Sequence, residues 1–311
     1  MFENKEYIYA VYQEKSFSKA AAKLYISQPS LSLTVKKVEK RIGGLLFDRS
    51  TNPVRLTDCG REYIRCVERI MDVETGFENF LNDLNELKTG NLSIGASNFF
   101  ASYILPPVIA RFKSRYPKVD LELTEADTIH LERALYAGDL DMIVDNYRLS
   151  ESIYDKYFYY SEQMILAVPE SLSTQKGIQR YRLDTSAIIA GIHRREDTLA
   201  PPLSLFAGTP FIALRPGNDT RDRMEQIFAE QGITPRITLE LDQLATAYHV
   251  ACSGLGATLT SDTLVRETTP AQKMCYYKLA STHAARSNFF YYKKTKYLTR
   301  AMREFLSMVA A

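Results

Sequence analysis

Side chains able to contact DNA lie close together between residues 28 and 37. This run contains an amide, several hydroxyls and two ammonium groups, in the order Gln28, Ser30, Ser32, Thr34, Lys36 and Lys37. A Gln amide can pair with adenine, a Ser hydroxyl can bond to a base edge or a phosphate, and Lys adds positive charge near the backbone. Such a set could read a base sequence if a helix carried it into the major groove.

Two short helices joined by a tight turn are predicted to position this run. The first spans residues 16–24, with Ser16 as its N-cap. The second has Ser27 as its N-cap and Pro29 in its first turn, and it ends at Gly43. Apolar residues at helical spacing mark the inward faces: Phe17, Ala20, Ala21 and Leu24, then Leu31, Val35, Val38 and Ile42. A helical pair with a merely solvated polar face would give the same spacing.

A predicted hairpin after the second helix favours the DNA-binding interpretation. Residues 45–49 form an apolar run that ends in a charge, 50–53 form a turn, and 54–56 form a short alternating strand. The tip of the hairpin bears Asn52 and is flanked by Arg49 and Arg55. A wing with these side chains could grip the phosphate backbone beside the groove.

The order of residues across this region is highly specific: Phe17-Ser18-x-Ala20-Ala21-x-x-Leu24-x-Ile26-Ser27-Gln28-Pro29-Ser30-Leu31-Ser32, then Val38-Glu39, Gly43, Leu46-Phe47-x-Arg49 and Leu56-Thr57-x-x-Gly60. Over about sixty residues at fixed spacing, it resembles the winged helix-turn-helix of LysR-type transcriptional regulators. The resemblance implies promoter DNA as a partner and these contact residues: Ser18, Ser27, Gln28, Pro29, Ser30, Ser32, Thr34, Lys36, Lys37, Arg49, Asn52 and Arg55. At Leu33 most members of the family have a polar or basic residue instead. An apolar contact with a thymine methyl could replace the hydrogen bond to a base that such a residue would make.

The charge distribution agrees with a DNA-binding head. Residues 1–57 hold ten Lys and Arg against five Asp and Glu, a balance of +5, and the whole chain totals +2, which leaves −3 for the remainder. A basic head on a slightly acidic body favours a local polyanion contact.

The sequence begins without a signal core and no run is long enough to span a membrane, so a cytoplasmic protein is expected. The four cysteines lack metal spacing and are expected to be reduced, with a redox role for Cys59 or Cys66 left open.

A helix over residues 3–13 is predicted to support the head, and a long linker helix is predicted over 59–89, capped by Thr57. The apolar residues of the linker recur as in a coiled-coil seam: Tyr63, Val67, Ile70, Val73, Phe77, Phe80, Leu81, Leu84 and Leu87. We predict a homodimer through this helix, because a protein that reads twofold half-sites needs a twofold axis. The alternative is a core helix of one globule. Gly76 is expected to mark a bend.

Strand and helix signals alternate from residue 90 to 311, which indicates an α/β domain with parallel sheets covered by helices. Strands are expected at 92–96, 119–124, 141–144, 164–168, 211–214, 237–241, 256–260, 276–279 and 289–293. Leu105-Pro106, Gly138-x-x-Asp141, Pro210-Phe211-Ile212 and Gly254-Leu255-Gly256 resemble the effector domain of the same family, which has the fold of periplasmic solute-binding proteins. The resemblance implies two lobes joined by crossing strands, about 91–162 with 269–311, and 163–268.

Ligands of open α/β sheets bind at the carboxyl ends of strands, near helix N-termini that favour anions. This geometry points to Asn98, Asn146, Asn218 and Thr220, and the resemblance implies Ser97 and Thr128. Each of the six could equally be an ordinary loop cap. The expected ligand is a small-molecule co-inducer of unknown identity, with no other cofactor. The segment 171–210 could be a loop over this site or a surface insertion.

Enzyme motifs are absent from the sequence, including the G-x-S-x-G elbow, the P-loop and H-E-x-x-H, and the four histidines show no metal spacing. The rival class is a stand-alone cytoplasmic solute-binding or sensor protein without direct base readout, and the basic head argues against it. We therefore expect a LysR-type regulator with a winged helix-turn-helix head (1–58), a linker helix (59–89) and a two-lobed effector domain (90–311). It would bind promoter DNA as a dimer of dimers, a homotetramer, with RNA polymerase as a further partner.

Overall fold

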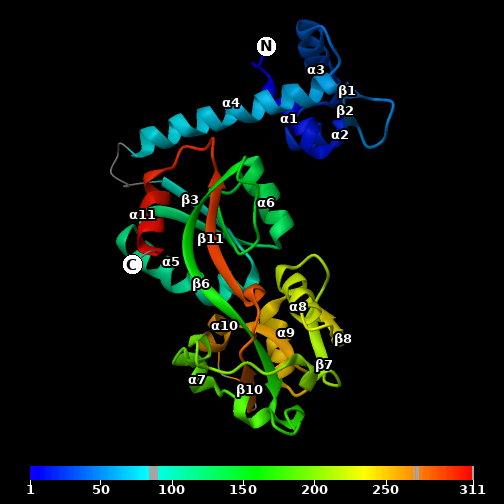
Figure 1. The fold of residues 1–311 in the computed structure, drawn as a ribbon. Coiled ribbons are helices and arrows are strands. Elements are labelled where there is room, and N and C mark those ends of the chain that lie inside the picture. Colours follow the sequence, from blue (N-terminus) through cyan, green and yellow to red (C-terminus); the bar gives the residue numbers. More distant parts are fainter. Residues whose placement is uncertain (84–89, 269, 271–272, 310–311) are drawn as a thin grey trace. The chain divides into compact units, whose positions relative to one another are not determined.

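The computed structural model describes residues 1–83, 90–268, 270 and 273–309. The chain divides into two compact units. The first is Met1–Leu84 with Thr295–Thr299, and the second is Asn85–Lys294 with Arg300–Ala311. Figure 1 labels the elements of both units.

The first unit is a helical head with a two-stranded wing, followed by a long helix (Figure 1). Its elements are α1 (Lys5–Glu14), α2 (Phe17–Lys23), α3 (Gln28–Ile42), the antiparallel pair β1 (Phe47–Asp48) and β2 (Arg55–Leu56), and α4 (Asp58–Asp83). The inward residues predicted from the spacing form a shared core: Ile8, Val11, Ala20, Ala21, Leu31, Val35 and Val38 are buried together. The predicted helical pair is therefore confirmed.

The N-caps predicted at Ser16, Ser27 and Thr57 are also confirmed. Each hydroxyl accepts the backbone N–H three residues along the chain, at 3.4, 3.3 and 3.0 Å respectively. A Cβ at Gly60 would lie 2.0 Å from the carbonyl oxygen of Leu46. Only glycine fits there, so α4 can begin directly against the chain that enters the wing.

Helix α4 is continuous through Gly76, so this glycine does not interrupt the helix. A Cβ on Gly76 would lie 3.2 Å from the Cβ of Tyr297, and the glycine therefore serves close packing of residues 295–299 on the helix. Tyr63 and Val67, predicted for the seam, are instead buried in the core of the head. Head and helix consequently pack as one unit rather than separating at residue 58.

Farther along α4, apolar side chains of the predicted seam face solvent. Val73 is 71% exposed, Phe77 61%, Phe80 43% and Leu81 45%. Leu84 and Leu87, the last two predicted seam positions, lie outside the described residues. Exposed large apolar groups on one helix mark a surface suited to a protein partner.

The second unit contains a mixed sheet with two long strands, β6 and β11, that pair side by side (Figure 1). Its order is β10-β6-β11-β5-β3-β4, and β9 also pairs with β6. The strands are β3 (Gly90–Ala96), β4 (Val119–Glu125), β5 (Met142–Asp145), β6 (Tyr154–Pro169), β9 (Thr258–Ser261), β10 (Met274–Tyr277) and β11 (Ala285–Lys293). A separate parallel pair consists of β7 (Pro210–Leu214) and β8 (Arg236–Leu241). The helices are α5 (Leu105–Arg115), α6 (Thr128–Ala137), α7 (Thr185–Ile189), α8 (Asp219–Ala229), α9 (Leu244–Cys252), α10 (Asp262–Glu267) and α11 (Arg300–Val309).

The expectation of parallel sheets holds only in part. Strands β3, β4 and β5 are parallel, but β6 and β11 are antiparallel to each other along most of their length. The sequence analysis identified only residues 164–168 of β6, because the first half of the strand is largely exposed or half-buried and mixes aromatic with polar residues without regular alternation. The antiparallel crossing was missed for this reason.

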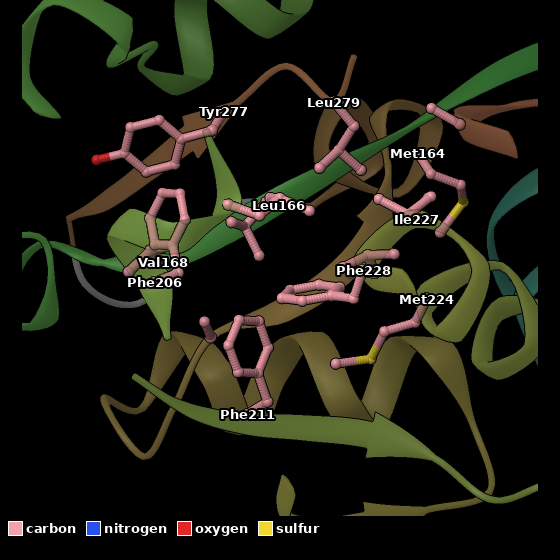
Figure 2. Packing of buried hydrophobic residues seen from close by; sticks show 14 of the residues in the cluster. Met164, Leu166, Val168, Phe206, Phe211, Met224, Ile227, Phe228, Tyr277 and Leu279 are labelled. Atoms are coloured by element: carbon pink, nitrogen blue, oxygen red, sulfur yellow. The ribbon is translucent and has the colours of Figure 1, made fainter. Parts of the chain in front are cut away.

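A hydrophobic cluster surrounds the second half of β6. Figure 2 shows Met164, Leu166 and Val168 on this strand with Phe206, Phe211, Phe228 and Tyr277 around them. Cys275, Leu279 and Ala284 belong to the same cluster. Residues 274–284 therefore pack with the second lobe, whereas the expected boundary at residue 269 assigned them to the first, because β10 pairs with the far end of β6.

The segment 171–210, for which two interpretations were open, is part of the second-lobe core. It forms α7 and short 3-10 turns at Ile178–Tyr181, Ile192–Arg194 and Leu203–Phe206. Ile178, Leu203 and Phe206 are buried in the cluster of Figure 2. Short turns with irregular apolar spacing give no periodic signal, so the sequence could not reveal this packing.

Candidate functional site

The outward face of α3 keeps Gln28, Lys36 and Lys37 in solvent. Among the described residues, none of these three side chains has a hydrogen-bond or ion-pair partner. Ser18, Pro29 and Ser30 are exposed as well. The opposite side of α3 is buried in the head, so this face has no partner within its own unit. It presents amide, hydroxyl and ammonium groups of the kinds that bind base edges and phosphates.

Three other predicted contact residues already have internal partners. The Ser27 hydroxyl caps α3. The Thr34 hydroxyl donates to the backbone carbonyl of Ser30 at 3.0 Å, and the Ser32 hydroxyl accepts from Arg49 at 3.0 Å. Ser27 and Thr34 therefore shape the helix itself, whereas Ser32 links it to the wing.

Arg49 is held within the protein rather than extended toward a ligand. Its guanidinium donates to Glu39 at 3.1 Å and to Ser32 at 3.0 Å, and it lies 4.6 Å from the ring centroid of Phe17. Glu39 is 5% exposed and also accepts the backbone N–H of Leu46 at 2.9 Å. Arg49 thus ties the wing to α2 and α3, a positioning role that the sequence did not reveal.

At the wing itself, Asn52 and Arg55 are exposed as predicted from the sequence. Two further exposed residues adjoin the α3 face. Tyr25 is 95% exposed in the turn before α3, with a φ of 54°, and Leu33 is 56% exposed on α3 itself. Tyr25 was missed as a candidate, although an aromatic residue in such a turn could have suggested contact with a ligand.

A cavity of about 440 Å³ lies between the two lobes of the second unit. Five of the six predicted effector residues line it: Ser97, Thr128, Asn146, Asn218 and Thr220. Asn98 does not, because its side-chain amide donates to Glu125 at 3.0 Å. The rule that ligands bind at strand ends therefore located this cavity from the sequence.

Three of the five predicted residues that line the cavity have side chains hydrogen-bonded within the protein. The Thr128 hydroxyl donates to Asp145 at 2.7 Å, the Asn218 side chain accepts the backbone N–H of Thr220 at 2.9 Å, and the Thr220 hydroxyl accepts from Arg286 at 3.1 Å. The side chains of Ser97 and Asn146 have no hydrogen-bond partner within the described chain. Both are available to a ligand without rearrangement.

None of the charged residues on the cavity wall was predicted, and two of them, Asp145 and Arg286, are buried. Asp145, at the end of β5, is 3% exposed, and burial raises its pKa despite hydrogen bonds from Thr128 and the backbone of Tyr147. Arg286 on β11 is 4% exposed and donates to Glu162 on β6 at 2.5 Å. Burial disfavours the charge of Arg286, but nearby Glu162 and Asp219 outweigh it and raise the pKa of Arg286.

Within the described residues, no group of three or more His, Cys, Asp or Glu side chains is arranged to hold a metal ion. None of the described helices combines the length and the apolar character needed to cross a bilayer.

Sequence-family comparison matches both parts of the chain. The bacterial regulatory helix-turn-helix protein, lysR family, matches residues 2–61, and the LysR substrate binding domain matches residues 85–311. Among relatives, the uncharacterized HTH-type transcriptional regulator YcgK of Bacillus subtilis (strain 168) is 29% identical over 309 residues, which cover 97% of this chain and 92% of YcgK. A probable RuBisCO transcriptional regulator of Trieres chinensis is 27% identical over 271 residues, covering 83% of this chain and 79% of that protein.

Solved structures share the fold across nearly the whole chain. A full-length OxyR variant from Pseudomonas aeruginosa matches with a TM-score of 0.69 at 22% identity, covering 98% of this chain and 92% of its own. Full-length CbnR complexed with its target DNA matches with a TM-score of 0.58 at 17% identity, covering 100% and 99%. At such identities the likeness concerns the fold alone.

Proposed function

Because the chain belongs to the LysR family and is a transcriptional regulator with a helix-turn-helix head and an effector-binding domain, we propose that it reads promoter DNA with α3 and its wing and responds to a small molecule in the interlobe cavity. The observation that carries the proposal is the face of α3. Gln28, Lys36 and Lys37 stand in solvent without internal partners, on a helix fixed from behind by the head core. Since promoter DNA is the target, the site of action is the cytoplasm.

The residues of this face divide into two roles. Gln28 is at the start of α3, where side chains of a recognition helix reach base edges, and its amide can pair with adenine. Lys36, Lys37 and Arg55 of the wing supply charge for the phosphates, and the amide of the tip residue Asn52 can donate a hydrogen bond to them. Leu33, exposed between them, can contact a thymine methyl.

The proposed assembly is a homodimer through α4, and two such dimers form a tetramer on paired half-sites. The exposed Val73, Phe77, Phe80 and Leu81 give α4 the apolar surface that a partner copy would cover. A twofold axis between two heads matches the symmetry of two half-sites. Filling the cavity would shift the balance between two arrangements of the assembly and so change contact with DNA or with RNA polymerase.

The test begins with a DNA site that the full-length protein selects from a random-sequence pool. Gln28→Ala should weaken binding to this site by about 1–3 kcal/mol and relax its base preference. Lys36→Ala should weaken binding to all sequences more evenly and reduce the salt dependence by about one unit of slope per chain. Gln179→Ala and Lys118→Ala are the matched controls, because both residues are exposed in the effector domain.

Footprinting and a salt titration distinguish the two variants. If Gln28→Ala protects the selected site as well as the unchanged protein does, α3 is not the reading helix. If both control variants lose affinity to the same extent as Gln28→Ala and Lys36→Ala, the loss has another cause than contact with DNA.

A further inference from the structure

The interlobe cavity is lined by an excess of acidic groups. Among the described residues on its wall, the carboxylates are Asp127, Glu132, Asp145, Asp219 and Asp242, and Arg286 is the one Lys or Arg side chain. Arg215 pairs with Asp242 at 3.5 Å and Arg223 with Asp219 at 2.8 Å, so arginines outside the lining offset part of this excess. The carboxylates that remain without a cation attract positive charge.

The positive charge of Arg286 is already neutralised. Its guanidinium pairs with Glu162 at 2.5 Å and with Asp219 at 3.3 Å. Glu162 is 1% exposed and lies behind the wall, so the pair belongs to the crossing strands. A carboxylate ligand would have to displace one of these partners to use Arg286.

Two of the helix N-termini at the cavity, those of α6 and α8, carry carboxylates of the protein itself. Asp127 caps α6 by accepting the backbone N–H of His130 at 2.9 Å. Asp219 is in the first turn of α8, and Asn218 caps that helix. The positive ends of α6 and α8 are therefore satisfied from within. The N-terminus of α9, on the second-lobe wall, has no side-chain cap, so the opposite wall that carries Asp145 and Glu132 is the one that disfavours an anion.

Two carboxylates on the first-lobe wall have no counter-charge. Asp145 is 3% exposed, and its hydrogen-bond donors, Thr128 and the backbone of Tyr147, are neutral. Within the described chain no Lys, Arg or His lies within ion-pair distance of it. Glu132 on α6 is half-buried and has neither a hydrogen-bond nor an ion-pair partner among the described side chains. A cation bound at this wall would supply the counter-charge that the buried Asp145 carboxyl lacks.

We propose that the effector is a small organic cation, with an ammonium or amidinium group held by Asp145 and Glu132. Its aliphatic or aromatic body would lie against Phe99, Phe100 and Leu214, which line the same cavity. This inference rests on the proposed function, because it names the chemical class of the ligand that the cavity takes. A cationic ligand is the opposite of the anionic ligand that strand ends and helix N-termini alone would favour.

The test compares probes that share a carbon skeleton and differ in charge. Cadaverine, pentanediol and glutarate form one series, and phenethylamine, phenylethanol and phenylacetate form another. Each is added at up to about 10 mM to the full-length protein in a thermal-shift assay, because a ligand that binds only the native state raises the melting temperature by mass action. Calorimetry then gives the dissociation constant of any probe that shifts it.

We expect at least one amine to stabilise the protein, while its alcohol and carboxylate analogues do not. Asp145→Asn, which keeps the shape of the side chain, and Glu132→Gln should each weaken that amine by about 10- to 100-fold. Glu196→Gln is the matched control, since Glu196 is exposed, does not line the cavity and loses the same charge. Its affinity for the amine should be unchanged.

Three results would overturn the inference. Binding of a carboxylate that Ser97→Ala or Thr128→Ala weakens would reject the cation and leave the cavity, and hence the proposed function, in place. Amine binding that Asp145→Asn and Glu132→Gln leave unchanged would mean a surface effect and would reject the assigned site. No shift with either amine would reject the ligand class, while DNA reading by α3 is judged separately by the Gln28→Ala footprint.

Discussion

Replacing Arg286 with Met should strongly destabilise the effector-binding domain, because Arg286 joins three of its elements. The guanidinium on β11 pairs with Glu162 on β6 and with Asp219 on α8, and it also donates to the hydroxyl of Thr220. Met fills a similar volume but leaves the carboxylate of Glu162 buried without its cation. An uncompensated buried charge is among the costliest changes in a protein interior.

The expected loss follows from the burial of the pair. The side chains of Arg286 and Glu162 are 2% and 0% exposed, so water screens the charge of an unpaired Glu162 only weakly. Removing one partner of such a pair costs about 3–5 kcal/mol. For a domain of this size each kcal/mol lowers the melting temperature by about 2–4 °C, which gives a decrease of about 6–20 °C.

Urea unfolding followed by circular dichroism measures the loss. Arg195→Met is the matched control, because Arg195 is exposed, and it should change stability by less than about 0.5 kcal/mol. Combining Arg286→Met with Glu162→Met should restore much of the stability, because Asp219 keeps its ion pair with Arg223. If Arg286→Met unfolds like the unchanged protein, or if the two substitutions are simply additive, the pair does not hold the crossing strands together.

Three further predictions concern other parts of the chain. Phe77→Asp should dissociate the proposed α4 dimer in sedimentation equilibrium. The change occurs twice in a twofold interface and would remove about 3–6 kcal/mol of association free energy. A variant that associates like the unchanged protein would refute the α4 interface. Arg49→Ala should lower the stability of the head by about 1–2 kcal/mol in thermal melts, because Glu39 loses its partner. An unchanged melting temperature would show that the Arg49–Glu39 ion pair does not stabilise the head. Burial alone would raise the pKa of Asp262, but hydrogen bonds from His193 and other donors outweigh it and lower the pKa. Its stabilisation should therefore be present above about pH 4 and be lost as pH falls through the lower native pKa, so urea midpoints of Asp262→Asn across acidic pH should fall less steeply than those of the unchanged protein.

The sequence predicted the head well because its structure is local. Caps at Ser16 and Ser27 and the spacing of Leu31, Val35 and Val38 depend only on neighbours a few residues apart. The pairing of Arg49 with buried Glu39 joins the wing to α3 over ten residues, and nothing in either residue type distinguishes it from an arginine directed at DNA.

In the effector-binding domain, the strand ends located the cavity but not its charge. Asn146 and Asn218 were predicted from their places after strands, Ser97 was implied by the family resemblance, and all three line it. The acidic excess depends on Glu132, which is on a helix face, and on the internal pairing of Arg286 with Glu162, 124 residues away in the sequence. Contacts across such a separation follow from the antiparallel crossing of β6 and β11, which the exposed first half of β6 concealed.

The most direct test of the central claim is a linkage cycle between DNA and a compound shown to bind the interlobe cavity. Affinity of the full-length protein for its selected DNA site is measured with and without that compound, and affinity for the compound is measured with and without DNA. We expect the same factor in both directions, about 5- to 150-fold, because coupling between two binding sites is reciprocal. A compound that fills the cavity and leaves the affinity for DNA unchanged would contradict the claim that the cavity regulates DNA binding.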